Sequence, residues 1–146
     1  MDFEQLAFIE KWRRRAVRGV VVALDATHGD TVLTLRVADF GPPLDLSGRD
    51  ETGAVRKQRL TIGDRVFVAF RYRLTDATPS TGARGAGALR KGAEVEGELV
   101  AQGDLAELEV GGVKIIVEGD LAAFAPGDKI RARISDDGAA YVIPTR

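Results

Sequence analysis

The stretch that decides the fold is LTIGDRVFVAFRYRL, residues 60–74. Gly63 and Asp64 are typical of a tight turn, and the residues that follow alternate between the two faces of a half-buried strand. A second stretch, FAPGDKIRARISDD at residues 124–137, has nearly the same plan. Because the plan occurs twice, we expect a duplicated small β-barrel.

The composition also favours an all-β chain. The 146 residues include 17 glycines, mostly single and between apolar runs, which suits many tight turns. The absence of cysteine excludes disulfides and thiolate metal sites. The net charge is −1, and neither half of the chain is strongly basic, unlike a domain that binds by neutralising phosphates.

The order of the turn and strand segments predicts four regions along the chain. They are an N-terminal helix at 1–16, a first barrel at 17–76 with a long loop at 41–58, a linker or mobile loop at 77–91, and a second barrel at 92–146. Three pairs of short motifs support the duplication because they recur in the same order. The pairs are Val17-x-Gly19 with Val95-x-Gly97, Gly29-Asp30 with Gly103-Asp104, and Gly63-Asp64 with Gly127-Asp128.

The N-terminal stretch DFEQLAFIEKWRRRAVR, residues 2–18, predicts an amphipathic helix. Packing on its own barrel is the common outcome for such a helix, and docking on another protein is the alternative. If it docks on a partner, the contacts are expected from its large apolar side chains. These are Leu6, Phe8, Ile9 and Trp12.

The segments of the second half resemble a known family. In residues 92–144 the stretches LVAQGDLAELEVGGVKIIVEGD, FAPGDKIRARIS and GAAYVIP follow the order of the soluble OB (oligonucleotide/oligosaccharide-binding) domain of NfeD proteins. The basic helix and RGVVVALD in the first half resemble the OB barrel of phage baseplate assembly proteins, which are structural adaptors. These resemblances imply two tandem OB-like (Greek-key) barrels after the helix, but a fold alone does not carry function.

Two arginines and a short loop resemble a third family. Arg14-x-x-x-Arg18 followed by Asp45-x-Ser47 is similar to the PilZ pattern, in which arginines hold the phosphates of cyclic di-GMP. Asp50 stands where that family has glycine. A degenerate PilZ-like nucleotide sensor is therefore a minor alternative.

Groups suited to catalysis or metal binding are few. The single histidine, His28, falls in a predicted hairpin turn, and no serine has the surroundings of a nucleophile elbow. Glu94, Glu96 and Glu98 share one strand face, which is more typical of a solvated acidic surface than of a metal site. We expect no enzymatic activity, no cofactor and no metal.

Single-stranded nucleic acid is the main alternative ligand, because OB barrels stack bases on aromatic rings beside a basic groove. Against this, Phe70 and Tyr72 share the alternation of the core face and would not be free to stack. The candidate contacts are basic residues of the first half. They are Arg56, Lys57, Arg59, Arg71 and Arg73.

Together these features predict a non-enzymatic structural or assembly protein. We expect it to be an adaptor that binds other protein subunits of a larger complex, such as a phage tail or injection machine. Copies of itself are an alternative partner. The start of the chain lacks a secretory pattern, and no apolar run approaches the roughly 20 residues that span a membrane. A soluble, cytoplasmic protein is therefore expected.

Overall fold

The computed structural model describes residues 7, 10–13, 15–26, 30–38, 42–80, 88–102, 105–119 and 121–143. Across these residues the chain forms ten strands, the short helix α2 (Ala54–Lys57) and a helical turn at 10–13. The strands are β1 (Val17–Asp25), β2 (Val32–Val37), β3 (Leu44–Asp50), β4 (Arg65–Pro79), β5 (Ala88–Leu89), β6 (Glu94–Ala101), β7 (Ala106–Val110), β8 (Val113–Gly119), β9 (Lys129–Ile134) and β10 (Ala139–Ile143). The prediction of an all-β fold is confirmed.

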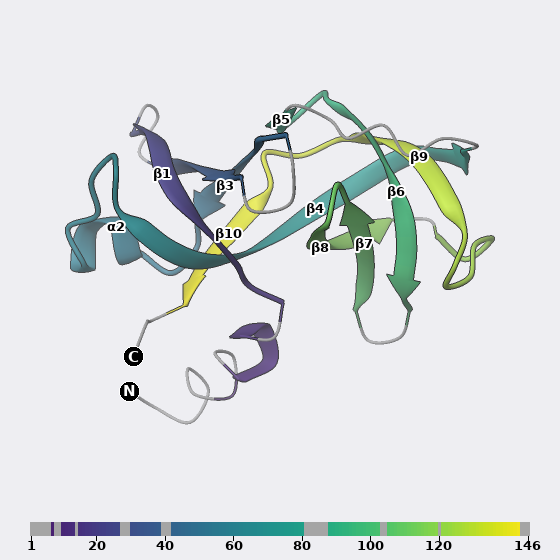
Figure 1. Cartoon of the computed structure of the whole chain (residues 1–146), viewed down its shortest axis with the longest axis horizontal. Helices are drawn as coiled ribbons and strands as arrows, with labels where there is room; N and C mark the ends of the chain where they lie inside the picture. Colours follow the sequence, from purple (N-terminus) through teal and green to yellow (C-terminus); the bar gives the residue numbers. More distant parts are fainter. Residues whose placement is uncertain are drawn as a thin grey trace.

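The ten strands form one sheet that returns twice to β4. Its order is β1-β2-β3-β10-β4-β8-β7-β6-β9, with β5 beside β3, and two further pairings join β1 to β4 and β4 to β9. The sheet therefore contains two closed circuits of hydrogen-bonded strands. One consists of β1, β2, β3, β10 and β4, and the other of β4, β8, β7, β6 and β9. Figure 1 shows β4 running from one circuit into the other.

Each repeat supplies its last strand segment to the circuit of the other repeat, where the first repeat is β1–β4 and the second is β6–β10. The first residues of β4 pair with β1, but the residues from Arg71 onward pair with β8 and β9 of the second repeat. In return, β10 pairs with β3 and β4 of the first repeat. The predicted limits 17–76 and 92–146 therefore do not coincide with the two circuits.

The two turns that suggested duplication are built alike. The N–H of Gly63 donates to the carbonyl of Val21 at 2.8 Å, and the N–H of Gly127 donates to the carbonyl of Leu99 at 2.7 Å. The aspartate that follows each glycine accepts a hydrogen bond at 2.9 Å from the backbone N–H three residues before it. Both glycines have positive φ, 101° and 99°. The repetition seen in the sequence therefore extends to the hydrogen bonding.

A second matched pair of glycines, Gly19 on β1 and Gly97 on β6, allows close contact between neighbouring strands. A Cβ added at Gly19 would lie 2.6 Å from the carbonyl oxygen of Arg36. At Gly97 it would meet the carbonyl oxygen of Glu109 and the side chain of Leu108. Neither site has room for a side chain, which explains why the motif Val-x-Gly occurs in both repeats.

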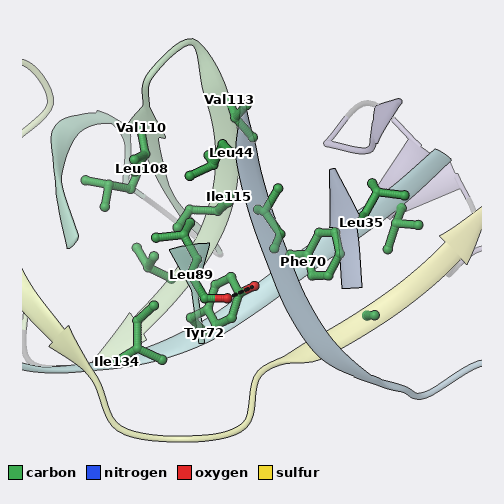
Figure 2. Close-up of a cluster of buried hydrophobic side chains, with 14 of the residues drawn as sticks. Leu35, Leu44, Phe70, Tyr72, Leu89, Leu108, Val110, Val113, Ile115 and Ile134 are labelled. Atoms are coloured by element: carbon green, nitrogen blue, oxygen red, sulfur yellow. Dashed lines mark hydrogen bonds between the residues drawn. The ribbon is translucent and has the colours of Figure 1, made fainter. Parts of the chain in front are cut away.

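One hydrophobic core runs through both circuits. Its buried side chains come from both repeats, for example Leu35 from β2 and Leu108 from β7 (Figure 2). Phe70 and Tyr72 are 1% and 0% exposed, so the prediction that they lie on the core face is confirmed. The phenol of Tyr72 donates to the carbonyl of Ser47 at 2.7 Å and to that of Leu89 at 3.3 Å. It thereby ties β4 to β3 and β5.

The predicted loop at 41–58 is wrong. Residues 44–50 form β3, which pairs with β2 along its whole length, and residues 54–57 form α2. The stretch is rich in turn-forming residues, but Leu44, Leu46 and Gly48 alternate with polar residues and are buried. Pairing with β2 thus outweighs the weak local preference for a strand.

The predicted linker at 77–91 is also partly in strands. Residues 77–79 belong to β4 and 88–89 form β5, whereas 81–87 lie outside the described residues. Gly111 and Gly112 both have positive φ and join β7 to β8 as a hairpin. After β9 the chain passes Asp137 and Gly138, and β10 then pairs within the first circuit.

We predict that Gly97→Ala and Gly19→Ala destabilise the protein by about 1–3 kcal/mol each, the usual cost of overpacking. The added methyl group would force apart two strands whose backbone contact closes a circuit. Urea unfolding followed by circular dichroism measures the change. Glu98→Ala, at an exposed position beside Gly97, is the control and should leave the unfolding midpoint nearly unchanged. Equal midpoints for all variants would contradict the explanation.

The buried phenol of Tyr72 predicts a sensitivity to alkali. Burial raises the pKa of Tyr72 well above its ordinary value, and the charge of Asp136 acts in the same direction. The unfolded chain loses this proton near pH ~10, whereas the folded chain keeps it, so stability falls as the pH rises above that value. Urea unfolding of Tyr72→Phe should show a smaller alkaline decline. The same decline as in the unaltered protein would refute this origin.

Candidate functional site

The N-terminal helical turn packs on the outside of the sheet. Trp12 is 4% exposed, and its ring stacks on that of Tyr141 from β10 at a centroid distance of 4.9 Å. Ala69 of β4 and Ile116 of β8 belong to the same cluster. The predicted partner contact of Trp12 is therefore wrong, because the chain itself covers this side chain. The other predicted contacts, which are Leu6, Phe8 and Ile9, lie outside the described residues.

The five basic residues proposed to contact nucleic acid lie on two separate elements. Arg56 and Lys57 are in α2 and Arg59 follows it, whereas Arg71 and Arg73 are on the part of β4 that pairs with β8. The guanidinium of Arg71 lies 5.9 Å from the ring centre of Tyr141, and that of Arg73 lies 3.4 Å from a carboxylate oxygen of Glu118. Phe70 and Tyr72 are buried in the core, so neither of their rings is exposed beside these arginines.

A groove on the outer face of the first circuit brings together three other arginines. It has a volume of about 460 Å³ and is centred on β1. Val20 in its floor pairs with Arg36 of β2 on one side and with Arg65 of β4 on the other. Arg18 lies two residues before Val20 and therefore on the same face. The groove is lined by Arg18, Gly19, Val20, Val22, Arg36, Ala38 and Arg65.

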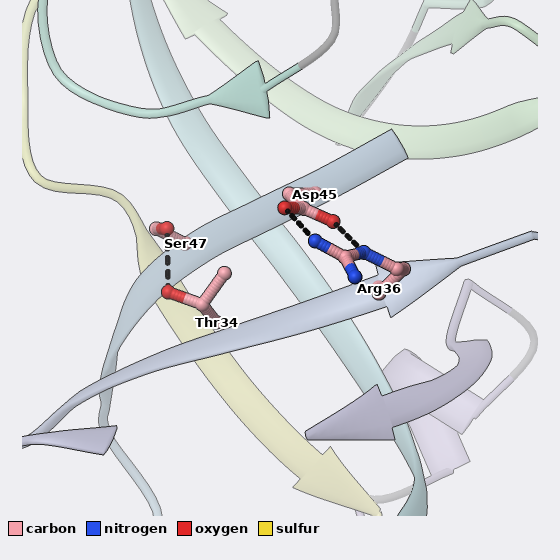
Figure 3. A network of polar contacts seen from close by, with 4 residues as sticks. All are labelled: Thr34, Arg36, Asp45 and Ser47. Atoms are coloured by element: carbon pink, nitrogen blue, oxygen red, sulfur yellow. Dashed lines mark hydrogen bonds and ion pairs between the residues drawn. The ribbon is translucent and has the colours of Figure 1, made fainter. Parts of the chain in front are cut away.

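The three guanidinium groups differ in their partners. Arg36 donates two hydrogen bonds to the carboxylate of Asp45, at 2.8 and 3.0 Å (Figure 3). These hydrogen bonds, together with the charge of Asp45, raise the pKa of Arg36 and hold its side chain in one orientation. Among the described residues, Arg18 and Arg65 have no ion-pair partner. Within the described residues, the groove thus has two positive charges without an ion pair beside a third cation of fixed orientation.

The second repeat has the same backbone but different side chains on this face. By the matched registers, Glu96 stands at the position of Arg18 and Glu109 at that of Arg36. Glu96 is 8% exposed and lies 2.7 Å from Arg131. The predicted solvated acidic face is therefore wrong at Glu96, which is buried in an ion pair. Of the three arginines that line the groove, Arg18 and Arg36 are thus matched by glutamates in the second repeat, whereas Arg65 is matched by Lys129.

The residues Asp45 and Ser47, which resembled part of a PilZ pattern, instead form contacts between strands of the sheet. Asp45 holds Arg36, and the hydroxyls of Ser47 and Thr34 share a hydrogen bond of 2.8 Å across β2 and β3 (Figure 3). Arg18 was recognised only through that pattern, and Arg14 lies outside the described residues. Arg36 was missed. The alternation of residues along β2 indicates that Arg36 faces outward. It does not indicate which strands lie beside Arg36.

Within the described residues, no group of three or more histidine, aspartate or glutamate side chains is arranged to hold a metal ion. No helix of the described part of the chain is long and apolar enough to cross a membrane. His28 lies outside the described residues.

No protein-family model matches the chain, and no curated protein matches it either. A solved structure that aligns with it is described as the cytoplasmic molybdate-binding protein ModG, in a crystal form with molybdate bound. The alignment covers 90% of this chain and 96% of that chain, with 17% identity and a TM-score of 0.49. This likeness is too distant to assign a ligand to the groove.

The predicted function as a phage-tail assembly adaptor is wrong. Trp12, which was expected to reach a partner, is packed against Tyr141 in the same chain. The resemblances to NfeD proteins and to phage baseplate proteins are not supported by the comparisons.

We predict that Trp12→Ala lowers the free energy of unfolding by about 3 kcal/mol, the lower end of the range for truncating a buried tryptophan. Trp12 is the single tryptophan of the chain, so its fluorescence reports its surroundings directly. Emission of the folded protein should be blue-shifted and resist quenching by iodide. Arg13→Ala, at an exposed neighbouring position, is the control. Strong quenching in the folded state would show that the helix does not pack as described.

Proposed function

We propose that this protein is a non-enzymatic binding protein that holds a small anionic ligand in the groove of Arg18, Arg36 and Arg65. The observation that carries the proposal is the pair of arginines without an ion-pair partner among the described residues, Arg18 and Arg65, beside a third held by Asp45. Like charges gathered on three neighbouring strands repel one another, and a bound anion would relieve that repulsion.

The size and chemistry of the groove fit such a ligand. A volume of about 460 Å³ lies within the range of small-molecule sites. Guanidinium groups bind carboxylate, phosphate and similar anions through two parallel N–H donors. Since Asp45 already occupies one edge of Arg36, the remaining N–H groups of Arg36 are oriented, but the ion pair as a whole carries little net charge. Arg18 and Arg65 would supply most of the attraction.

We further infer that each circuit of strands is a small OB-like barrel. The closed order of five strands and the matched turns at Gly63 and Gly127 support this description. The groove would then lie on the outer wall of the first barrel. The absence of catalysis, the cytoplasmic location and self-association remain predictions.

Isothermal titration calorimetry at low ionic strength, with phosphate, sulfate, molybdate and citrate as probes, tests the proposed function. We expect saturable binding of at least one anion and a loss of about tenfold or more in affinity for Arg18→Gln and for Arg65→Gln, because a charged hydrogen bond is worth 1.5–3 kcal/mol. Arg90→Gln, which removes an exposed arginine outside the groove, is the control. Equal losses in all three variants would indicate nonspecific attraction and reject the site.

Asp45→Asn provides a test in the opposite direction. Removing the carboxylate leaves Arg36 without its ion pair, so the groove gains one positive charge. We expect tighter anion binding and a steeper decrease of affinity with salt. A decrease in affinity would show instead that the fixed orientation of Arg36 matters more than its charge. Circular dichroism confirms that each variant is folded.

A further inference from the structure

We infer that the ligand is an organic dianion with a flat, apolar body, and not an inorganic anion. This inference rests on the proposed function, because it concerns the same groove. It follows from three features: an apolar floor, an exposed aromatic ring beside Arg18, and the number of charges that remain uncompensated.

The floor of the groove is apolar although its rim is cationic. Val20 and Val22 point outward from β1, and Ala38 follows β2. All three side chains lack hydrogen-bonding groups, so they offer nothing to a hydrated inorganic ion. They would instead be covered by an apolar part of a ligand, which removes their surface from water.

Phe67 extends this apolar surface. It is 40% exposed and lies two residues from Arg65, on the same face of β4. In the register of β1 and β4 it is the direct partner of Arg18. Side chains in such pairs have their Cβ atoms about 5 Å apart. A ligand held by Arg18 could therefore contact the ring of Phe67.

The second repeat holds different side chains at these two positions. The matched cross-strand pair there is Glu96 and Arg131, whose charged groups are 2.7 Å apart. The opposite charges of that pair therefore compensate each other within the chain. In the first repeat the same places hold Arg18 and Phe67, a cation without an ion pair among the described residues and an exposed ring. The pair of residues is therefore complementary to a molecule that is both anionic and aromatic.

The charge of the ligand follows from the arginines. Asp45 neutralises Arg36 through two hydrogen bonds, whereas Arg18 and Arg65 have no ion-pair partner among the described residues and contribute two positive charges to the groove. A dianion balances them. A more highly charged anion would leave negative charge unpaired beside Asp45, which would weaken its binding.

A series of probes with one headgroup tests the inference. Inorganic phosphate, phenyl phosphate and 1-naphthyl phosphate are compared by calorimetry at about pH 7.5, where the esters are mainly dianions because their second pKa is near 6. We expect affinity to rise by roughly 3- to 10-fold from phosphate to the aryl esters, in line with the energy of an aromatic pair. Naphthyl phosphate should bind most tightly.

Substitutions at Phe67 separate the ring from the charges. Phe67→Ser should remove most of the gain of the aryl esters while leaving the affinity for inorganic phosphate within about twofold, because it changes no charge. Phe67→Leu keeps an apolar side chain without a ring and should retain part of the gain. Neither Phe67 nor Ile62 is among the residues that line the groove, but only Phe67 is paired with Arg18. Ile62→Ser, which removes a hydrophobic residue that is 68% exposed, therefore serves as the control.

Each outcome decides one of the two proposals. Equal affinities for phosphate and the aryl esters would overturn this inference and leave the anion site standing. An aryl gain that survives Phe67→Ser and Phe67→Leu, or that Ile62→Ser removes equally, would also overturn it. If none of the probes binds, and the anions tested above do not bind either, the anion site itself is rejected.

Discussion

Both circuits of the sheet depend on the continuous pairing of β4, a single strand of 15 residues. Its first residues close the first circuit against β1, and its later residues close the second against β8 and β9. A strand that belongs to two circuits must place apolar side chains inward along most of its length. From Val66 to Leu74 it does so, with Phe70 and Tyr72 in the middle.

The exchange of last strands makes the two repeats dependent on each other. β10 completes the first circuit, and the end of β4 completes the second, so neither repeat can form all its hydrogen bonds alone. The continuous core and the bonds of Tyr72 to β3 and β5 strengthen this link. Separate folding of the two halves would leave strand edges and apolar surface exposed to water.

The same backbone supports two different outer faces. Where the second repeat joins Glu96 to Arg131, the first repeat has Arg18 and Phe67. Interior residues of the two repeats are constrained alike by the glycine contacts and turns. Outward residues are free of that constraint, so this face could become a binding site in one repeat without a change of fold. The face that carries the groove of Arg18, Arg36 and Arg65 therefore differs from the matched face of the second repeat in its side chains and not in its backbone.

The sequence by itself determined the all-β character, the repeated turns and the inward face of β4, because period-2 alternation and glycine-aspartate turns are local properties of the chain. It did not predict β3, whose pairing with β2 outweighs its loop-like composition, nor the exchange of β10. The groove could not be predicted either. Arg36 and Arg65 lie on either side of Val20 only because β1 pairs with both β2 and β4. That arrangement arises from long-range pairing that no local pattern specifies.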